Sequence, residues 1–281
     1  PWDNLDVSTL TNDGRTILRR SLEWAGLTST FCDADYIPDT KLGEFLTSAY
    51  GSNNIQGLTY LPQGKTFNGV AVPADGAWIS VNYADGRFYM TDTAGNYLTD
   101  MAPPIGAPTG VAYVGSGTWA DHLVVIAQTP GEVQFYDLTG TLVSSFSTTL
   151  LGSAGATGVT FLDTTASGVY DGHLAISDSN ADKVFLATQS GSLVSSFDTS
   201  AFSLRTNDLA HIPGSDKLLL IDRDAIVYVV DFAGTVLGQY DVAPFGATVP
   251  EALAVNLETC DHVAGDDTPD LVVTLGQSAG S

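Results

Sequence analysis

Gly140-Thr-Leu-Val-Ser-Ser-Phe146 returns almost unchanged as Gly191-Ser-Leu-Val-Ser-Ser-Phe197, and this repetition decides the fold. Looser copies of the phrase begin at Lys41, Gly95 and Gly234. A second, shorter apolar phrase follows each copy and begins at Gly57, Gly110, Gly158, Asp208 and Ala252. Repeats with a period of about 40 to 50 residues indicate a supersecondary unit that is used several times.

Each repeat contains four strand-like runs. Two further apolar runs lie between the phrases, for example residues 173–177 and 183–187. The inner runs are continuously apolar, as in strands buried on both faces, whereas the outer phrase alternates, as in a strand with one wet face. Dipeptides such as Asp85-Gly86 mark the turns. Four short strands repeated at this period predict an all-β protein, a β-propeller.

The two ends of the chain set the predicted number of blades. The C-terminal part supplies a first strand (252–257) and a second (271–275), and the N-terminal part supplies a third (31–37) and a fourth (41–46) without partners. Together they predict a fifth four-stranded blade, formed as a clasp of both termini. A six-bladed ring is the alternative, and it needs further strands from residues 1–30.

Two cysteines lie at this predicted clasp. Cys32 would open the third strand of the closing blade, and Cys260 would follow its first strand. An even number of cysteines in an extracellular chain favours a disulfide. We expect Cys32 and Cys260 to form one, which could stabilise the ring by about 4–5 kcal/mol in the chain-entropy model. Two free buried thiols are the alternative.

Residues 1–30 differ from the repeats, so the predicted propeller domain spans residues 31–281. The apolar side chains in this N-terminal extension have helical spacing, and Gly26 is a natural end for a helix. We therefore expect an amphipathic helix whose apolar face contains Ile17, Leu18, Leu22, Trp24 and Ala25.

Composition narrows the possible partners. The 281 residues carry a formal net charge of −22, from 32 acidic and 10 basic residues. Such a field repels phosphate backbones, which argues against nucleic acid. No apolar run approaches the roughly 18 to 20 residues of a membrane span. The charge suits divalent cations and an extracellular setting, so we expect a secreted or cell-surface protein whose secretion signal was removed or lay upstream.

The blade phrase resembles a known repeat. Ala175-Ile-Ser-Asp-Ser-Asn-Ala-Asp-Lys-Val-Phe185, followed by Gly191-Ser-Leu-Val194, is similar to the NHL-type propeller repeat, although Asn180 is displaced and Lys183 replaces an arginine. The resemblance covers the repeat rhythm of residues 31–275. It implies a propeller of the broad group that includes NHL proteins, gluconolactonase-like enzymes and lyase-type propellers, and it implies no particular activity.

A second resemblance concerns residues 8–26. Leu10-Thr-Asn-Asp-Gly-Arg-Thr-Ile-Leu18 and Ser21-Leu-Glu-Trp-Ala25 look like the closing helix of glutamine-amidotransferase-like domains in large secreted bacterial proteins. The resemblance implies that this chain is covalently part of a longer protein.

Polar residues recur where each inner strand begins. Propellers place function at the centre of the ring, on the face that carries the loops from fourth to first strands. The residues expected at this channel mouth are Gln56, Thr109, Thr157, Asn207, Asp208 and Glu251. Two readings remain open for them: a ligand site, or a ring of hydrogen-bonded polar residues with trapped water.

Two sets of residues are candidate metal ligands. Gluconolactonase-like propellers hold a divalent cation with Glu, Asn and Asp at the mouth, and the resemblance assigns these roles to Glu251, Asn207 and Asp208. Separately, Asp178, Asn180 and Asp182 have the alternate spacing of a calcium loop, without the glycine and distal glutamate of an EF-hand. Calcium is therefore a possible cofactor at either place, and a β-turn explains the second set equally well.

The sequence favours binding over catalysis. It contains no Gly-x-Ser-x-Gly motif and no histidine spacing that suggests a metal pair or a nucleophile's base. The long loops before the inner strands carry Tyr50, Leu150, Leu151, Phe202 and Phe245, which would suit a protein, peptide or carbohydrate partner. We expect a non-catalytic binding module; a divalent-metal-dependent lactonase- or lyase-type enzyme is the alternative.

Overall fold

The structure is a computed structural model that describes residues 51, 54–163, 167–245, 249–255 and 271–275. These residues form strands and two short 3-10 helices, η3 (Thr148–Leu151) and η4 (Ala243–Phe245), but no α-helix. No helix among them has the length and hydropathy of a membrane span.

Four antiparallel sheets of four strands follow one another along the chain. Blade 1 contains β1 (Ile55–Leu61), β4 (Ala77–Asn82), β5 (Phe88–Thr91) and β6 (Tyr97–Met101), with the small hairpin β2 (Thr66–Phe67) and β3 (Val70–Ala71) between β1 and β4. Blade 2 contains β7 (Pro108–Val114), β8 (His122–Ala127), β9 (Glu132–Asp137) and β10 (Leu142–Ser147). Blade 3 contains β11 (Ala156–Leu162), β12 (His173–Asp178), β13 (Lys183–Ala187) and β14 (Leu193–Asp198). Blade 4 contains β15 (Thr206–His211), β16 (Lys217–Asp222), β17 (Ile226–Asp231) and β18 (Val236–Asp241), and β19 (Pro250–Val255) then pairs with β20 (Leu271–Leu275).

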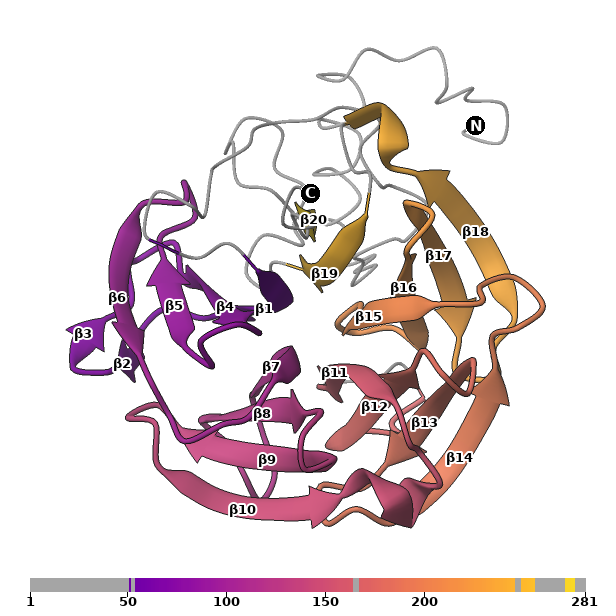
Figure 1. Ribbon diagram of the computed structural model, residues 1–281, viewed down its shortest axis with the longest axis horizontal. Helices are drawn as coiled ribbons and strands as arrows, with labels where there is room; N and C mark the ends of the chain where they lie inside the picture. The colour runs from indigo at the N-terminus through magenta and orange to yellow at the C-terminus, as the bar shows by residue number, and fades with distance from the viewer. Residues whose placement is uncertain (1–50, 52–53, 164–166, 246–248, 256–270, 276–281) are drawn as a thin grey trace, which may run out of the picture.

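The sheets are arranged radially around a centre (Figure 1). The first strand of each sheet is innermost, and these strands contact one another in the cyclic order β1, β7, β11, β15, β19 and back to β1. Four-stranded antiparallel sheets repeated in this way define a β-propeller. The all-β propeller predicted from the repeats is therefore confirmed.

The number of complete blades differs from the prediction. The described residues form four four-stranded blades, not five, and the fifth position holds the two-stranded sheet β19–β20. The strands expected at 31–37 and 41–46 lie outside the described residues, as do Cys32, Cys260 and the helix predicted within residues 1–30. The six-bladed alternative needs a sixth inner strand, and the described part of the chain supplies five.

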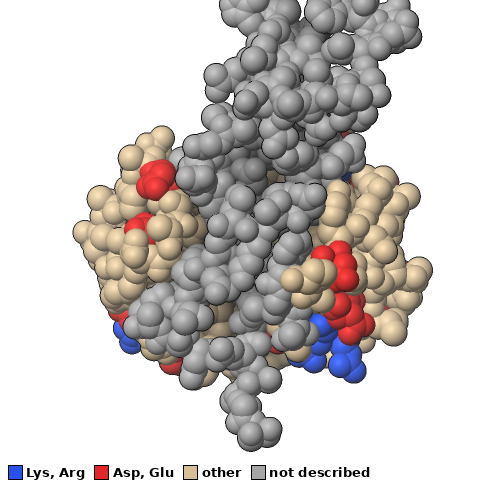
Figure 2. All heavy atoms as spheres, turned by 90° about the horizontal axis from the view of Figure 1, so that it is seen from above, with Lys and Arg blue, Asp and Glu red and all other residues tan. Residues whose placement is uncertain are grey.

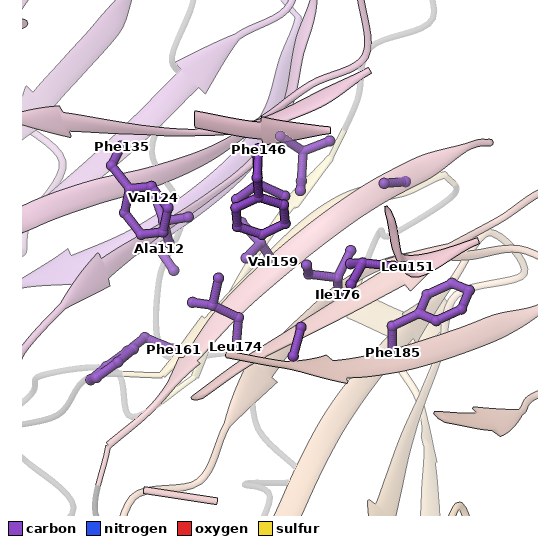
Figure 3. Close-up of a cluster of buried hydrophobic side chains, with 14 of the residues drawn as sticks. Ala112, Val124, Phe135, Phe146, Leu151, Val159, Phe161, Leu174, Ile176 and Phe185 are labelled. Carbon is purple, nitrogen blue, oxygen red and sulfur yellow. The ribbon is translucent and has the colours of Figure 1, made fainter. Parts of the chain in front are cut away.

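The apolar core is divided among the boundaries between neighbouring sheets. At the boundary of blades 2 and 3, Phe135 and Phe146 pack with Val159, Phe161 and other side chains of the next blade (Figure 3). Separate clusters fill the other four boundaries, including those on both sides of the β19–β20 sheet. The inner strands are buried almost throughout because each has a neighbouring sheet on both faces.

The repeated outer-strand phrase is explained by a contact between blades. Its glycine completes the turn between third and fourth strands with a left-handed φ, for example +85° at Gly191 and +84° at Gly234. A Cβ on Gly191 would lie 2.6 Å from the ring of Phe146, and a Cβ on Gly234 would lie 2.6 Å from the ring of Phe197. The glycine that begins these two copies of the phrase therefore packs on the phenylalanine that ends the preceding copy, whereas Gly140 meets Met101 in the same place.

The charge on the described surface is dispersed. On the side shown in Figure 2, acidic and basic side chains form small groups, and most of the described surface between them is uncharged. Among the described residues, the ion pair Lys65–Asp121 joins positions 56 residues apart, and Arg87–Asp100 joins positions 13 residues apart.

Candidate functional site

The residues expected at the channel mouth share one structural position. Each inner strand has a β-bulge near its N-terminal end, where its pairing with the second strand skips one residue. The skipped residues are Gln56, Thr109, Thr157, Asn207 and Glu251. A bulge residue has no partner in the ladder, so its side chain is available for other contacts. We call the face where the inner strands begin the start face, and the opposite face the end face.

Polar side chains at the start face hydrogen bond across blade boundaries. Thr157 Oγ1 donates to the carbonyl oxygen of Thr206 at 3.1 Å, and Asn207 Nδ2 donates to that of Pro250 at 2.8 Å. Both acceptors lie one residue before the bulge of the next sheet. These bonds satisfy backbone groups at the start of the inner strands and tie neighbouring sheets together.

The corresponding contacts in the first two blades are weaker. Thr109 Oγ1 lies 3.5 Å from the carbonyl oxygen of Ala156. Gln56 Nε2 donates to Asn54 Oδ1 at 3.3 Å, within its own blade. The polar ring is therefore most closely connected between blade 3 and the β19–β20 sheet.

Asn207 and Glu251 are the two predicted metal ligands that the structure brings together. Asn207 Nδ2 lies 3.3 Å from Glu251 Oε2, and both side chains occupy bulge positions. Burial raises the pKa of the Glu251 carboxyl, and the positive charge of Arg223 opposes this shift. This pair is the polar centre of the candidate site.

Asp208 does not join that pair. Its side chain is only 1% exposed; Oδ2 accepts a hydrogen bond from the Leu253 amide at 3.0 Å, and Oδ1 has no hydrogen-bond partner. The first three blades have Gly57, Gly110 and Gly158 at this position, and a Cβ on Gly158 would lie 2.4 Å from Asp208 Oδ1. Burial therefore raises the pKa of Asp208 well above its usual value. Asp208 lies at the boundary of β11, β15 and β19 rather than on the open mouth.

Asp178 has its own set of protein donors. Its Oδ2 accepts from Ser153 Oγ at 2.6 Å and from the amides of Ala154 and Gly155 at 3.1 Å, and its Oδ1 accepts from the amides of Asn180 and Ala181 at 2.9 Å. Burial would raise the pKa of Asp178, but these hydrogen bonds outweigh burial and lower it. The carboxylate therefore fastens a start-face loop to the turn after β12.

Asn180 and Asp182 each have surroundings of their own. The Asn180 amide lies against Gly155, where a Cβ would be 2.2 Å from Nδ2. Asp182 has a left-handed φ of 50°, and its buried Oδ1 has no hydrogen-bond partner. Among the residues that the structure describes, no group of three or more His, Cys, Asp or Glu side chains is placed to hold a metal ion. Calcium at either predicted set stays a prediction.

A cavity lies at the other end of the channel. A cavity of about 370 Å³ is lined by the C-terminal halves of all five inner strands and by the residues that follow them. Its polar wall residues are Thr59, Gln63, Lys65, Tyr113, Thr160, Asp163 and His211. Sequence reasoning did not assign these residues to a site; the available signal was the threonine at the third position of the inner phrase in blades 1 and 3.

Thr59 and Thr160 accept hydrogen bonds from backbone amides of the neighbouring inner strands. Thr59 Oγ1 accepts from the Tyr113 amide at 3.0 Å, and Thr160 Oγ1 accepts from the His211 amide at 3.2 Å. The His211 ring is buried, so its pKa is lowered; Nε2 donates to the Ser215 carbonyl at 3.0 Å, and Nδ1 has no partner. The cavity wall is therefore hydrogen-bonded and largely uncharged.

Two loop residues on the start face expose large aliphatic side chains. Leu150, in η3, is 64% exposed, and Leu204, just before β15, is 65% exposed. Leu151 and Phe202 were also expected at loop tips, but Leu151 is buried and Phe202 packs against Tyr228 with ring centroids 5.1 Å apart. Leu204 was not identified from the sequence, because the polar residues Arg205 and Thr206 follow it and it is not part of a recognisable apolar pattern.

Comparisons with known proteins concern the fold class of this chain. No protein-family model and no curated protein sequence matches the chain. The fold is similar to the crystal structure of Myxococcus xanthus glutaminyl cyclase, at 15% identity, a TM-score of 0.54, and coverage of 74% of this chain and 83% of that one. At this identity the similarity concerns the fold alone, and with the geometry above it makes this chain a β-propeller protein.

Two further solved structures are similar at lower scores. Kuenenia stuttgartiensis hydrazine synthase matches at 15% identity and a TM-score of 0.44, over 73% of this chain and 52% of that chain. A chain of a nidogen/laminin complex matches at 17% identity and a TM-score of 0.48, over 72% of this chain and 69% of that chain. This chain thus spans about half the length of the hydrazine synthase chain.

Proposed function

We propose that this propeller is a non-catalytic binding module of a larger secreted or cell-surface protein, and that it holds a peptide or a loop of a partner protein on its start face. The observation that carries the proposal is the exposure of Leu150 and Leu204 on loops of this face. Loops held by a rigid scaffold commonly bind partners, and exposed apolar side chains favour a protein partner.

The chemistry of the channel mouth supports binding rather than catalysis. The donors of Thr157 and Asn207 are used on backbone carbonyl oxygens, and the Glu251 carboxyl is paired with an amide rather than with a nucleophile. Covalent catalysis requires a nucleophile and a base within hydrogen-bonding reach. The polar ring is better suited to orienting a ligand than to activating one.

The test compares substitutions on the two faces of the propeller, at residues whose side chains are similarly exposed. Leu150→Asp and Leu204→Asp alter the start face, whereas Val169→Asp alters an end-face loop residue that is also 64% exposed. The wild-type chain and all three variants are applied to peptide and glycan arrays. Binding to peptides that is lost in both leucine variants and kept in Val169→Asp supports the proposal. Binding that only Val169→Asp abolishes overturns it, and binding confined to glycans identifies a carbohydrate ligand instead.

A divalent-metal-dependent enzyme of the lactonase or lyase type is the second candidate, because Asn207 and Glu251 are in contact. Thermal melting with EDTA and with millimolar calcium distinguishes it. A cation at 100 times its dissociation constant should stabilise the fold by about 2.7 kcal/mol. A calcium shift that Glu251→Ala abolishes would favour the metal site, and the absence of a shift would favour the binding module.

A secreted or surface location also carries a chemical expectation. In an oxidising compartment Cys32 and Cys260 should be joined. Intact mass after alkylation without reductant should show no added label, and reduction should allow two. Uptake of two labels by the unreduced protein would contradict the disulfide and weaken the case for this location.

A further inference from the structure

The end-face cavity has the size of a small-ligand site. Its volume of about 370 Å³ lies within the range of roughly 300–1,000 Å³ typical of such pockets. Its wall is mixed in polarity: inner-strand residues such as Leu58, Val111 and Val159 line it together with Thr59 and Thr160. Polar groups in such a wall fix the orientation of a ligand.

The charged side chains described around the cavity leave one carboxylate without a paired cation. The Lys65 ammonium, at 2.6 Å, is paired with Asp121, which also accepts a hydrogen bond from the Tyr113 hydroxyl. This hydrogen bonding from Lys65 and then Tyr113 lowers the pKa of Asp121, so the pair is a neutral ion pair at physiological pH. Asp163 is the remaining carboxylate in the described wall, and no cation is paired with it among the described residues.

The described neighbours of Asp163 leave its carboxyl partly accessible. Ser116 Oγ donates a long hydrogen bond to Oδ1 at 3.3 Å. Oδ2 lies beside Gly115, where an added Cβ would be 3.0 Å away, and the described residues donate no hydrogen bond to it. Gly115 therefore leaves uncovered the oxygen that a ligand could reach.

The aromatic residues of the wall also favour a cation. Tyr60, Tyr113 and Phe161 line the cavity, and aromatic faces attract organic cations. The net charge of −22 adds a long-range negative potential, which also attracts cations. An anion would have to displace Asp121 from Lys65 and would meet Asp163.

We propose that the end-face cavity binds a small organic ammonium ion, whose charge lies at Asp163 and whose short apolar body lies among the inner strands. This site is separate from the proposed start-face surface and does not depend on it. A failure of either proposal leaves the other standing.

The test uses three probes of matched shape: n-pentylammonium, 1-pentanol and pentanoate. Titration calorimetry with the full chain should give the tightest binding for n-pentylammonium, with 1-pentanol about fivefold weaker, as expected for loss of one partly screened ion pair. Pentanoate should bind least. Equal binding of the ammonium ion and the alcohol, or no binding of the ammonium ion, would overturn the proposal.

Variants locate the site. Asp163→Asn should weaken n-pentylammonium to the level of 1-pentanol, Asp163→Glu should retain a preference for the ammonium ion, and Asp163→Lys should shift the preference to pentanoate. Asp224→Asn, which neutralises an exposed carboxylate on the start-face turn of blade 4, is the control and should bind as wild type. Unchanged n-pentylammonium affinity in Asp163→Asn, with wild-type melting, would place binding elsewhere and overturn the proposal.

Discussion

Gly191 lies against the face of Phe146, so closely that a Cβ on the glycine would be 2.6 Å from the ring. The two residues belong to successive copies of one phrase in adjacent blades. This contact explains why a glycine and an aromatic residue occupy these two positions. The glycine allows the turn and leaves space beside it, and the aromatic side chain fills that space.

Gly191→Ala should therefore destabilise the fold for two reasons. The left-handed φ of +85° costs about 1 kcal/mol for alanine, and the clash with Phe146 adds about 1–3 kcal/mol. Gly152→Ala is the control, because Gly152 has a φ of +81° with nothing within 4 Å of the added Cβ. Urea denaturation should show a clearly larger loss for Gly191→Ala; equal losses would mean that the interblade contact contributes nothing.

Asp178→Ala should lower the free energy of unfolding by about 3 kcal/mol, since it removes a buried carboxylate that accepts five hydrogen bonds. Because the folded-state pKa of Asp178 is lowered, the stability that it contributes is present above the unfolded-state pKa and is lost as pH falls through the folded-state pKa. Denaturation at several acidic pH values should show a smaller acid dependence in the variant. A calcium-dependent loss would instead assign Asp178 to a metal site.

Asp208→Asn should stabilise the protein at neutral pH by about 1–3 kcal/mol, because the amide has no charge to desolvate or to neutralise, whereas burial raises the pKa of the carboxyl. The folded-state pKa of Asp208 is raised, so its contribution is fully present below the unfolded-state pKa and is lost as pH rises through the folded-state pKa. The advantage of the variant should grow with pH over this interval. Asp224→Asn, at an exposed position, is the control for the substitution itself. A pH-independent difference at 208 would contradict a buried carboxyl with a raised pKa.

Asn207→Ala should cost about 1–3 kcal/mol, because the buried carbonyl oxygen of Pro250 loses its donor. Thr109→Val removes the corresponding but longer contact of 3.5 Å and should cost less. Thermal and urea unfolding of the two variants measure the difference. An equal loss of stability at both positions would show that the length of these hydrogen bonds does not determine how much they stabilise the blade boundaries.

Much of the fold could be predicted because its signals are local. The strands, their order in each blade and the turns follow from apolar runs and from glycines such as Gly191. The five bulge residues were found from sequence for the same reason: each precedes a recognisable phrase. Their common position does not depend on which ligand, if any, they contact.

Features that depend on distant segments could not be predicted. The hydrogen-bond partners of Asp178 could not be predicted, because its donors Ser153, Ala154 and Gly155 come from a loop more than 20 residues upstream. The contacts of Asp208 with Leu253 and Gly158 could not be predicted either, because these residues lie on other inner strands. The end-face cavity depends on five inner strands at once, and no single repeat contains it.

The division of the core among the blade boundaries has a consequence for how the molecule unfolds. A blade removed from the ring would expose apolar side chains on both of its faces, and each neighbour would lose the apolar contacts on one of its faces. No blade can therefore melt alone, and amide exchange in the inner strands should occur only through global opening. The repeats are separate in sequence, but thermodynamically they are a single body.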